Sequence, residues 1–414
     1  MATIAPIEYF DEADFDPFVI DDDVFGEIED PYAIFDRARA NGPVQPGTIL
    51  ELLGAPADSI VAGIPQFRVI GHAEVQAVMR NAALFSNDVL KMNLGVTFGD
   101  TISAMNPPKH TQVRGLFQST FMPKQVAKWS ETLVDPVVND LIGRFIGDGR
   151  AELVEQFAKR YPFEIIYRQL GLPQRDVQTF HRLAVTLTFN SDYIRYGKEA
   201  SRKLGVYFQN LLEERRRNPA DDLVSLLGQL GGDNGLSDET IVSFFRGLIN
   251  AAGDTTYRAT GCMLMALLEN PEQLEAVRQD RSLVPLVLEE TLRWNGPIIF
   301  TQRMVMQDTE LGGVRMPAGA IVNVSMAAAN NDPAVHENPR KFDLFRGTKS
   351  HFGFGLGPHM CLGQHLARLE MSRALNAILD RLPGLRFDPD MPKPTVKGGL
   401  MRTPRDIHVL FDPS

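Results

Sequence analysis

Apolar side chains recur at steps of three and four residues over much of the chain, and this spacing predicts helices with one buried face. Prolines and glycines break the pattern between residues 111 and 231, so several helices are expected there. The longest run follows Ser237, a good N-cap residue, and stops at Asn270, just before a proline. At about 1.5 Å per residue, a helix over residues 237–270 is roughly 50 Å long, so it must cross the whole molecule.

Strand patterns are short and are bounded by turn residues. They cover Phe67 to Ile70, the run Ile321 to Val324 and the terminal stretch 407–411. A second long helix is expected from about Leu362 to Leu382, inside a segment of residues 351–382 that opens with a glycine-rich loop. The sequence therefore predicts a mainly α fold with small β-sheets, of the α+β class.

The first thirty residues show no sustained period and are rich in acidic side chains, which predicts an extended strap over residues 1–30. These acidic residues are Glu8, Asp11, Glu12, Asp14, Asp16, Asp21, Asp22 and Asp23. No internal repeat and no interdomain linker is visible, so one domain over residues 1–414 is expected.

Composition narrows the classes of function. Of the 414 residues 44% are hydrophobic, which is enough for a large core without disulfides, and the only cysteines, Cys262 and Cys361, lie in unlike surroundings that suit a reducing cytoplasm. A net charge of −10 and the lack of a Lys/Arg-rich run argue against nucleic acid as a partner. No window approaches the ~18 apolar residues that span a bilayer, and no signal peptide is visible, so a cytoplasmic protein without a membrane anchor is expected.

One cysteine lies between a glycine-rich turn and the start of an apolar helix. The stretch reads Phe354-Gly355-Leu356-Gly357-Pro358-His359-Met360-Cys361-Leu362-Gly363. A thiol at a helix N-terminus lies near unpaired backbone N–H groups, which favour the thiolate and allow it to bind a metal. The alternative is a buried and inert cysteine.

This loop resembles the haem-binding loop of cytochrome P450s, Phe-Gly-x-Gly-x-His-x-Cys-x-Gly, with all six fixed positions filled. The resemblance extends over nearly the whole chain, and the helix after the cysteine is similar to that of soluble bacterial members. It implies the cytochrome P450 fold, in which a long oxygen-activating helix and the cysteine loop sandwich haem b. It also implies that Cys361 is the axial ligand of the iron and that Phe354 and Gly363 lie at the haem.

Two further segments are similar to family motifs. Glu290 and Arg293 form the Glu-x-x-Arg pair, which in the family joins a third basic group from a later segment and braces the haem loop. In that later segment Lys341 stands where an arginine is commoner. His110 and Arg114 match the family's His-x-x-x-Arg, and the resemblance implies that they bind the haem propionates together with Arg303 and His359. Without a haem, both motifs would be ordinary pairs on helix surfaces.

The third similar segment carries the chemistry. The expected long helix contains a polar cluster, Ala251-Ala252-Gly253-Asp254-Thr255-Thr256, inside an apolar run, and Ala252 stands where the family commonly has glycine. By resemblance the helix loosens here, Thr255 provides a hydroxyl beside the reacting dioxygen, and Asp254 passes protons from solvent. The alternatives are that Thr255 bonds to a helix carbonyl and that Asp254 pairs with a surface base.

The resemblance implies a haem-thiolate monooxygenase that inserts one atom of O₂ into a small lipophilic substrate, by hydroxylation or oxidative dealkylation. Electrons are expected from a separate ferredoxin or flavodoxin and its NAD(P)H-dependent reductase, because no such domain is fused. Alternatives are a haem-thiolate sensor, or an isomerase or dehydratase without external electrons, although the pair Asp254 and Thr255 disfavours both. The expected substrate contacts are Met92, Phe98, Phe189, Leu248, Ala251, Ile298, Ile299 and Leu400.

Overall fold

The computed structural model describes residues 5–10, 15–20, 26–55, 59–189, 193–231, 235–347 and 350–412. Six of the acidic residues in the expected strap, Asp11, Glu12, Asp14, Asp21, Asp22 and Asp23, lie outside the described residues. Of the rest of the strap, residues 5–10 and 26–30 have no regular structure, but residues 17–20 form a helical turn, which the sequence did not predict.

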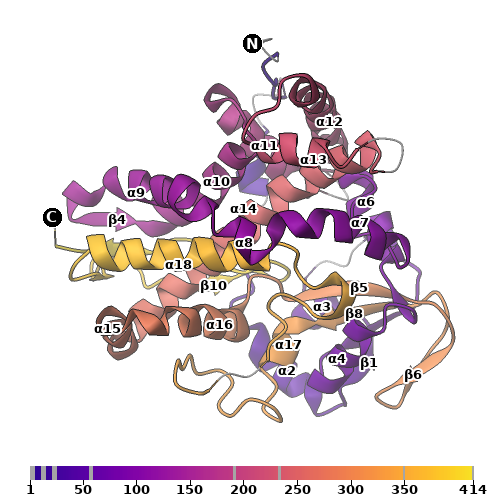
Figure 1. Cartoon of the computed structure of the whole chain (residues 1–414). Helices are drawn as coiled ribbons and strands as arrows, with labels where there is room; N and C mark the ends of the chain where they lie inside the picture. Colours follow the sequence, from indigo (N-terminus) through magenta and orange to yellow (C-terminus); the bar gives the residue numbers. More distant parts are fainter. Residues whose placement is uncertain are drawn as a thin grey trace.

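Helices dominate the fold and surround one long helix, α14 (Figure 1). Their bounds are α2 Pro31–Arg39, α3 Ile49–Leu53, α4 His72–Arg80, α5 Asp88–Met92, α6 Leu94–Phe98, α7 Lys109–Gln118, α8 Pro123–Val126, α9 Asp135–Gly143, α10 Tyr161–Gln169, α11 Val177–Thr186, α12 Ile194–Arg217, α13 Leu223–Gly228, α14 Asp238–Glu269, α15 Pro271–Gln279, α16 Val284–Asn295, α17 Met326–Asn330 and α18 Gln364–Arg381.

Helix α14 confirms the predicted long helix almost to the residue. Its N-cap is Ser237, whose side chain accepts a hydrogen bond from the backbone N–H of Thr240, and its 32 residues correspond to about 48 Å. The helix is α-helical throughout, so the loosened turn expected beside Asp254 is absent. The Thr255 hydroxyl donates to the Ala251 carbonyl at 2.7 Å within the unbroken helix, so the hydrogen bond named as an alternative for Thr255 is formed, and the hydroxyl oxygen can still accept another.

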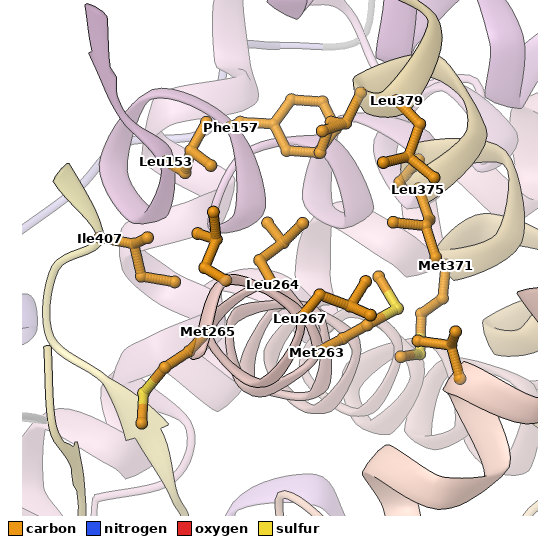
Figure 2. Close-up of a cluster of buried hydrophobic side chains, with 14 of the residues drawn as sticks. Leu153, Phe157, Met263, Leu264, Met265, Leu267, Met371, Leu375, Leu379 and Ile407 are labelled. Carbon is orange, nitrogen blue, oxygen red and sulfur yellow. The ribbon is translucent and has the colours of Figure 1, made fainter. Parts of the chain in front are cut away.

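The C-terminal half of α14 passes through the largest apolar core (Figure 2). Met263, Leu264 and Leu267 are buried there, and Leu375 of α18 and Phe157 of a π-helical turn over Val154–Ala158 belong to the same cluster. Burying a side chain of this size contributes about 1.5–3 kcal/mol, so this core fixes the position of α14 against α18.

The sequence predicts small β-sheets, and the strands of the described residues form four of them. The largest has the order β1-β2-β8-β5-β3, with β2 and β8 parallel and the other pairs antiparallel. The terminal strand, predicted over 407–411, pairs on one side with β4, which is distant in sequence, and on the other side with β9, which precedes it closely. The bounds are β1 Val44–Pro46, β2 Gln66–Val69, β3 Phe85–Ser86, β4 Arg150–Glu152, β5 Phe300–Val305, β6 Thr309–Leu311, β7 Val314–Met316, β8 Ile321–Ser325, β9 Arg386–Phe387, β10 Val396–Lys397, β11 Thr403–Pro404 and β12 His408–Leu410.

Among the described residues, no helix combines the length and apolar character needed to cross a bilayer.

Candidate functional site

A cavity of about 400 Å³ lies between α14 and the cysteine loop. Its wall on one side is a stripe of α14 that includes Leu248, Ala251 and Thr255, and on the other side it is the loop around Cys361 with the first two turns of α18. Helix α7 and strand β5 close a further side with His110 and Arg303. Segments almost 300 residues apart in sequence therefore meet at one cavity, whose size suits a small organic ligand.

The cysteine loop is a tight turn held by its backbone. The Cys361 N–H donates to the Phe354 carbonyl at 2.8 Å, and Gly357 has a positive φ of 74°. A Cβ on Gly357 would lie 2.3 Å from the Met79 carbonyl oxygen, so only glycine fits this approach to α4. Cys361 lines the cavity just before the N-terminus of α18, with Gly363 at the N-cap position.

The Cys361 thiol experiences opposing influences. Burial raises its pKa, whereas a backbone hydrogen bond from Gly363 and the positive charge of Arg114 lower it. Phe354 is the first residue of the cysteine loop, and the guanidinium carbon of Arg368 lies 4.2 Å from the centre of the Phe354 ring. The loop therefore holds both predicted residues, Phe354 and Gly363, at the cavity wall around the thiol.

Four basic side chains, His110, Arg114, Arg303 and His359, line the same cavity, as the motifs predict. The rings of His110 and His359 are 3.9 Å apart between centroids, and burial lowers their pKa values to about 4 and about 3. Burial likewise lowers the pKa of Arg303 to about 10. Both ring nitrogens of His110 and Nε2 of His359 are buried without a hydrogen-bond partner. Together with Arg114 and Arg303, these unpaired nitrogens form a polar, basic end of the cavity that can bind an anionic group.

The α14 wall faces the cysteine across the cavity. Thr255 and Thr256 line the cavity, but Asp254 does not. The Asp254 carboxylate instead accepts a hydrogen bond from Nε of Arg258 at 3.0 Å, and both side chains are buried. The alternative of a surface base is therefore corrected, because the base that pairs with Asp254 is itself in the interior.

The family model described as cytochrome P450 matches residues 171–411, which is more than half of the chain. The chain belongs to the cytochrome P450 family. It is 30% identical over 400 residues to the cytochrome P450 monooxygenase PikC of Streptomyces venezuelae, covering 92% of this chain and 93% of PikC. It is also 30% identical over 380 residues to 6-deoxyerythronolide B hydroxylase of Saccharopolyspora erythraea, covering 87% of this chain and 91% of that enzyme.

A solved structure extends the comparison to three dimensions. The structure of P450BioI in complex with an acyl carrier protein ligated to hexadec-9Z-enoic acid superposes with a TM-score of 0.82 at 26% identity, covering 92% of this chain and 99% of that one. The predicted P450 fold is confirmed. This cytochrome P450 is thus an oxidoreductase, and the cofactor of the family is a haem held by a cysteine thiolate.

The residues of this P450 fit that cofactor. Only Cys361 among the cysteines lines the cavity, because Cys262 is fully buried in the core. A haem carries two carboxylates, and the unpaired nitrogens of His110 and His359 lie where an anionic group would be bound.

The Glu-x-x-Arg pair is formed, but its third member differs from the one expected. Arg293 donates two hydrogen bonds to Glu290, both at 2.8 Å. The third basic group is Arg346, whose Nε donates to Glu290 Oε1 at 2.8 Å. The Lys341 side chain is exposed, and Lys341 contributes its carbonyl, which accepts from both arginines. Lys341 therefore does not replace the arginine, because a residue five positions later supplies a planar guanidinium.

Three of the eight residues predicted at the substrate, Leu248, Ala251 and Ile298, line the cavity, and the other five do not. Phe98, Phe189 and Ile299 are buried in neighbouring apolar clusters, where they pack against protein instead. Met92 is partly exposed, and Leu400 packs beside the cluster of Ile299 and accepts its backbone N–H. Residue type alone could not show which of these residues contact the substrate, because the same apolar residue types occur in cores and in pockets.

Several lining residues were missed. The helix stripe continues from Leu248 and Ala251 in steps of three and four to Phe244 and Ala259, so helical periodicity could have found these two. Others, such as Ile102, come from loops whose path no local pattern predicts. The further lining residues include Leu90, Leu94, Thr101, Ser103, Phe121, Thr256, Thr301 and Glu370.

Proposed function

We propose that this chain is an electron-fed haem-thiolate monooxygenase and that residues 1–414 work as one P450 domain. The observation that carries the proposal is the cavity with Cys361 on one wall and Thr255 on the other. Cys361 is the proposed axial ligand, supported by its place at the cavity wall before the N-terminus of α18. When bound, haem would supply the activation of dioxygen that no side chain of the chain can perform.

The proposed roles of the basic residues follow from their burial. His110, Arg114, Arg303 and His359 would hold the propionates, since all four line the cavity and the nitrogens of His110 and Nε2 of His359 have no hydrogen-bond partner among the described residues. Glu290 and Arg293 are proposed as structural residues. Their buried ion pair with Arg346 fixes the segment over residues 337–346 against α16.

Thr255 and Asp254 are the proposed proton-handling residues. The Thr255 hydroxyl is at the cavity wall and donates to a carbonyl of its own helix, so it can accept a second hydrogen bond from the cavity side. Asp254 keeps a small accessible surface and can exchange a proton. In this proposal Asp254 takes up a proton and Thr255 orients its delivery.

The proposed substrate is a small lipophilic molecule that is hydroxylated or oxidatively dealkylated. Most of the wall away from the basic cluster is apolar, including Leu90, Leu94, Phe244, Leu248 and Ile298. The printed names of two relatives support a lipophilic substrate. One relative is named 6-deoxyerythronolide B hydroxylase, and the structure of another is a complex with an acyl carrier protein ligated to hexadec-9Z-enoic acid. We further propose a ferredoxin, with its NAD(P)H-dependent reductase, as electron donor and a cytoplasmic location, in keeping with two unpaired cysteines.

Reduced carbon monoxide difference spectra test the haem assignment. The purified holoprotein should give the red-shifted Soret band of a thiolate-ligated haem, and Cys361→Ser should lose it while Cys262→Ser keeps it, because Cys262 lies in the core. A folded protein that binds haem without this band would contradict the assignment.

Turnover with a surrogate ferredoxin and reductase separates a monooxygenase from a sensor or an isomerase. A screen of lipophilic compounds for the low-spin to high-spin shift selects the test substrates. A product that gains an oxygen atom from O₂, at the expense of NAD(P)H, supports the proposal. Spin shifts without electron-dependent product would favour the sensor, and product without electrons would favour the isomerase or dehydratase.

A further inference from the structure

A buried ion pair lies on α14, next to the cavity wall but outside it. Arg258 donates Nε to Asp254 Oδ1, and the two side chains retain 2% and 11% of their surface. Neither residue lines the cavity, whereas Thr255 and Thr256 between them do. The pair therefore lies behind the polar wall of the cavity and shares a helical turn with it.

A buried ion pair of this kind is weak evidence for a role in stability. Charges taken from water into the interior lose their hydration, and replacing such a pair with well-packed apolar residues is commonly neutral or stabilising. Removing only one partner leaves a buried charge without compensation, which is strongly destabilising. A role in the chemistry that Asp254 performs gives a reason for its presence.

Both partners of the ion pair belong to one helix. Asp254 and Arg258 are four residues apart on the same unbroken helix, so a shift of α14 against its neighbours leaves their separation unchanged. The guanidinium carbon of Arg258 also lies 4.9 Å from the centre of the Tyr257 ring, a distance that favours a cation–π contact. Separating the pair therefore requires one of the two side chains to rotate.

We propose that Arg258 is a positioning residue that holds the Asp254 carboxylate in the orientation from which it relays protons toward Thr255. This inference rests on the monooxygenase function proposed above. The carboxylate takes one proton from solvent and gives one proton to the cavity side, where reduced dioxygen consumes it. Asp254 thus returns to its ionised form, and its pair with Arg258 is restored.

The test compares Arg258→Met, Arg258→Lys, Asp254→Asn and the double variant D254N/R258M as holoenzymes. The measurement is NADPH consumption through a surrogate ferredoxin and reductase, in H₂O and in D₂O. Protons are consumed whenever dioxygen is reduced, so the natural substrate is not required. Arg246→Met is the matched control, because Arg246 is a partly buried arginine on the same helix that bonds to the Ser201 carbonyl instead of a carboxylate.

Asp254→Asn should slow consumption by at least about tenfold and raise the solvent isotope effect. Arg258→Met should change both quantities in the same direction, Arg258→Lys should change them less, and Arg246→Met should leave the isotope effect unchanged. Because Arg258 acts through Asp254, the double variant should be no slower than Asp254→Asn alone. A wild-type rate and isotope effect in Arg258→Met, or additive losses in the double variant, would overturn the proposal.

The same set of variants also provides the control for a loss of folding. If Arg258→Met loses the carbon monoxide band, the comparison of D254N/R258M with Asp254→Asn decides, since the double variant removes both charges of this ion pair. Equal rates support the positioning role, and a slower double variant refutes it. Failure of the proposed function is distinguishable, because the wild-type protein itself would then lack the band or the electron-dependent activity.

Discussion

The network around Glu290 gives a sharp test of which residue is the third basic partner. Arg346 donates Nε to Glu290 at 2.8 Å, and its other nitrogens donate to the carbonyls of Glu337 at 2.7 Å and Lys341 at 2.6 Å. Arg346→Ala removes these three hydrogen bonds and a longer one, of 3.4 Å, to the Asn338 carbonyl. Glu290 keeps both hydrogen bonds from Arg293, so its charge stays compensated.

The magnitude follows from these contacts. Hydrogen bonds to charged groups contribute about 1.5–3 kcal/mol each, and the carbonyls become accessible to water once Arg346 is gone, so the expected loss is about 3 kcal/mol. For a chain of 414 residues this corresponds to a fall in Tm of about 3–4 °C. Arg346→Lys should lose part of this, since lysine keeps the charge but not the planar fork.

The assay is urea unfolding of the holoprotein, followed by circular dichroism and by the thiolate-ligated carbon monoxide band. Lys341→Ala is the control, because its side chain is exposed and only its backbone carbonyl takes part, so it should cost less than about 0.5 kcal/mol. If Lys341→Ala destabilised the protein as much as Arg346→Ala, the assignment of Arg346 would be refuted.

Three further predictions concern the cavity wall and the core. Thr255→Ala should lower the product formed per NADPH by about tenfold while Thr255→Ser restores most of it, measured as coupling on a compound that gives the spin shift; equal coupling in all three proteins would exclude the hydroxyl. Gly253→Ala places a Cβ 2.3 Å from the Phe163 ring and should lower the free energy of unfolding by about 1–3 kcal/mol. Phe163→Leu in the same protein should recover part of this loss, and wild-type stability of Gly253→Ala would contradict the close packing of α10 on α14. Burial lowers the pKa of His181 to about 3. The contribution of this neutral histidine to the unfolding free energy is therefore fully present above about pH 6.5 and is lost as the pH falls toward 3. The expected loss is about 2 kcal/mol at pH 5. His181→Phe, which keeps a ring against Phe163, should reduce the difference in unfolding free energy between pH 7.5 and pH 5 by this amount, and an unchanged difference would show that other groups cause it.

The features that follow from local physics could be predicted. Ser237 begins the long helix because its side chain accepts the N–H of Thr240, and Gly357 permits the positive φ of 74° that the turn before Cys361 adopts. Fixed spacing likewise placed Glu290 against Arg293, since residues three apart share a helix face.

Contacts between distant segments could not be predicted. Arg346 reaches Glu290 across 56 residues of sequence, and the loop between them sets which basic residue arrives. Phe98 and Ile299 belong to apolar clusters, whereas Leu248 lines the cavity, although all three are large apolar residues. The difference depends on which neighbours fill the space beside each side chain.

The sequence by itself determined the family resemblance, the cysteine loop, the long helix and the basic residues of the candidate site. Each of these depends on interactions between residues close in sequence or on a motif of fixed spacing. Only the tertiary structure decided that Arg258 is buried with Asp254, that Arg346 completes the ion network and which apolar side chains face the cavity. Burial and long-range pairing depend on how whole elements pack, because solvent exclusion at one residue is produced by others far along the chain.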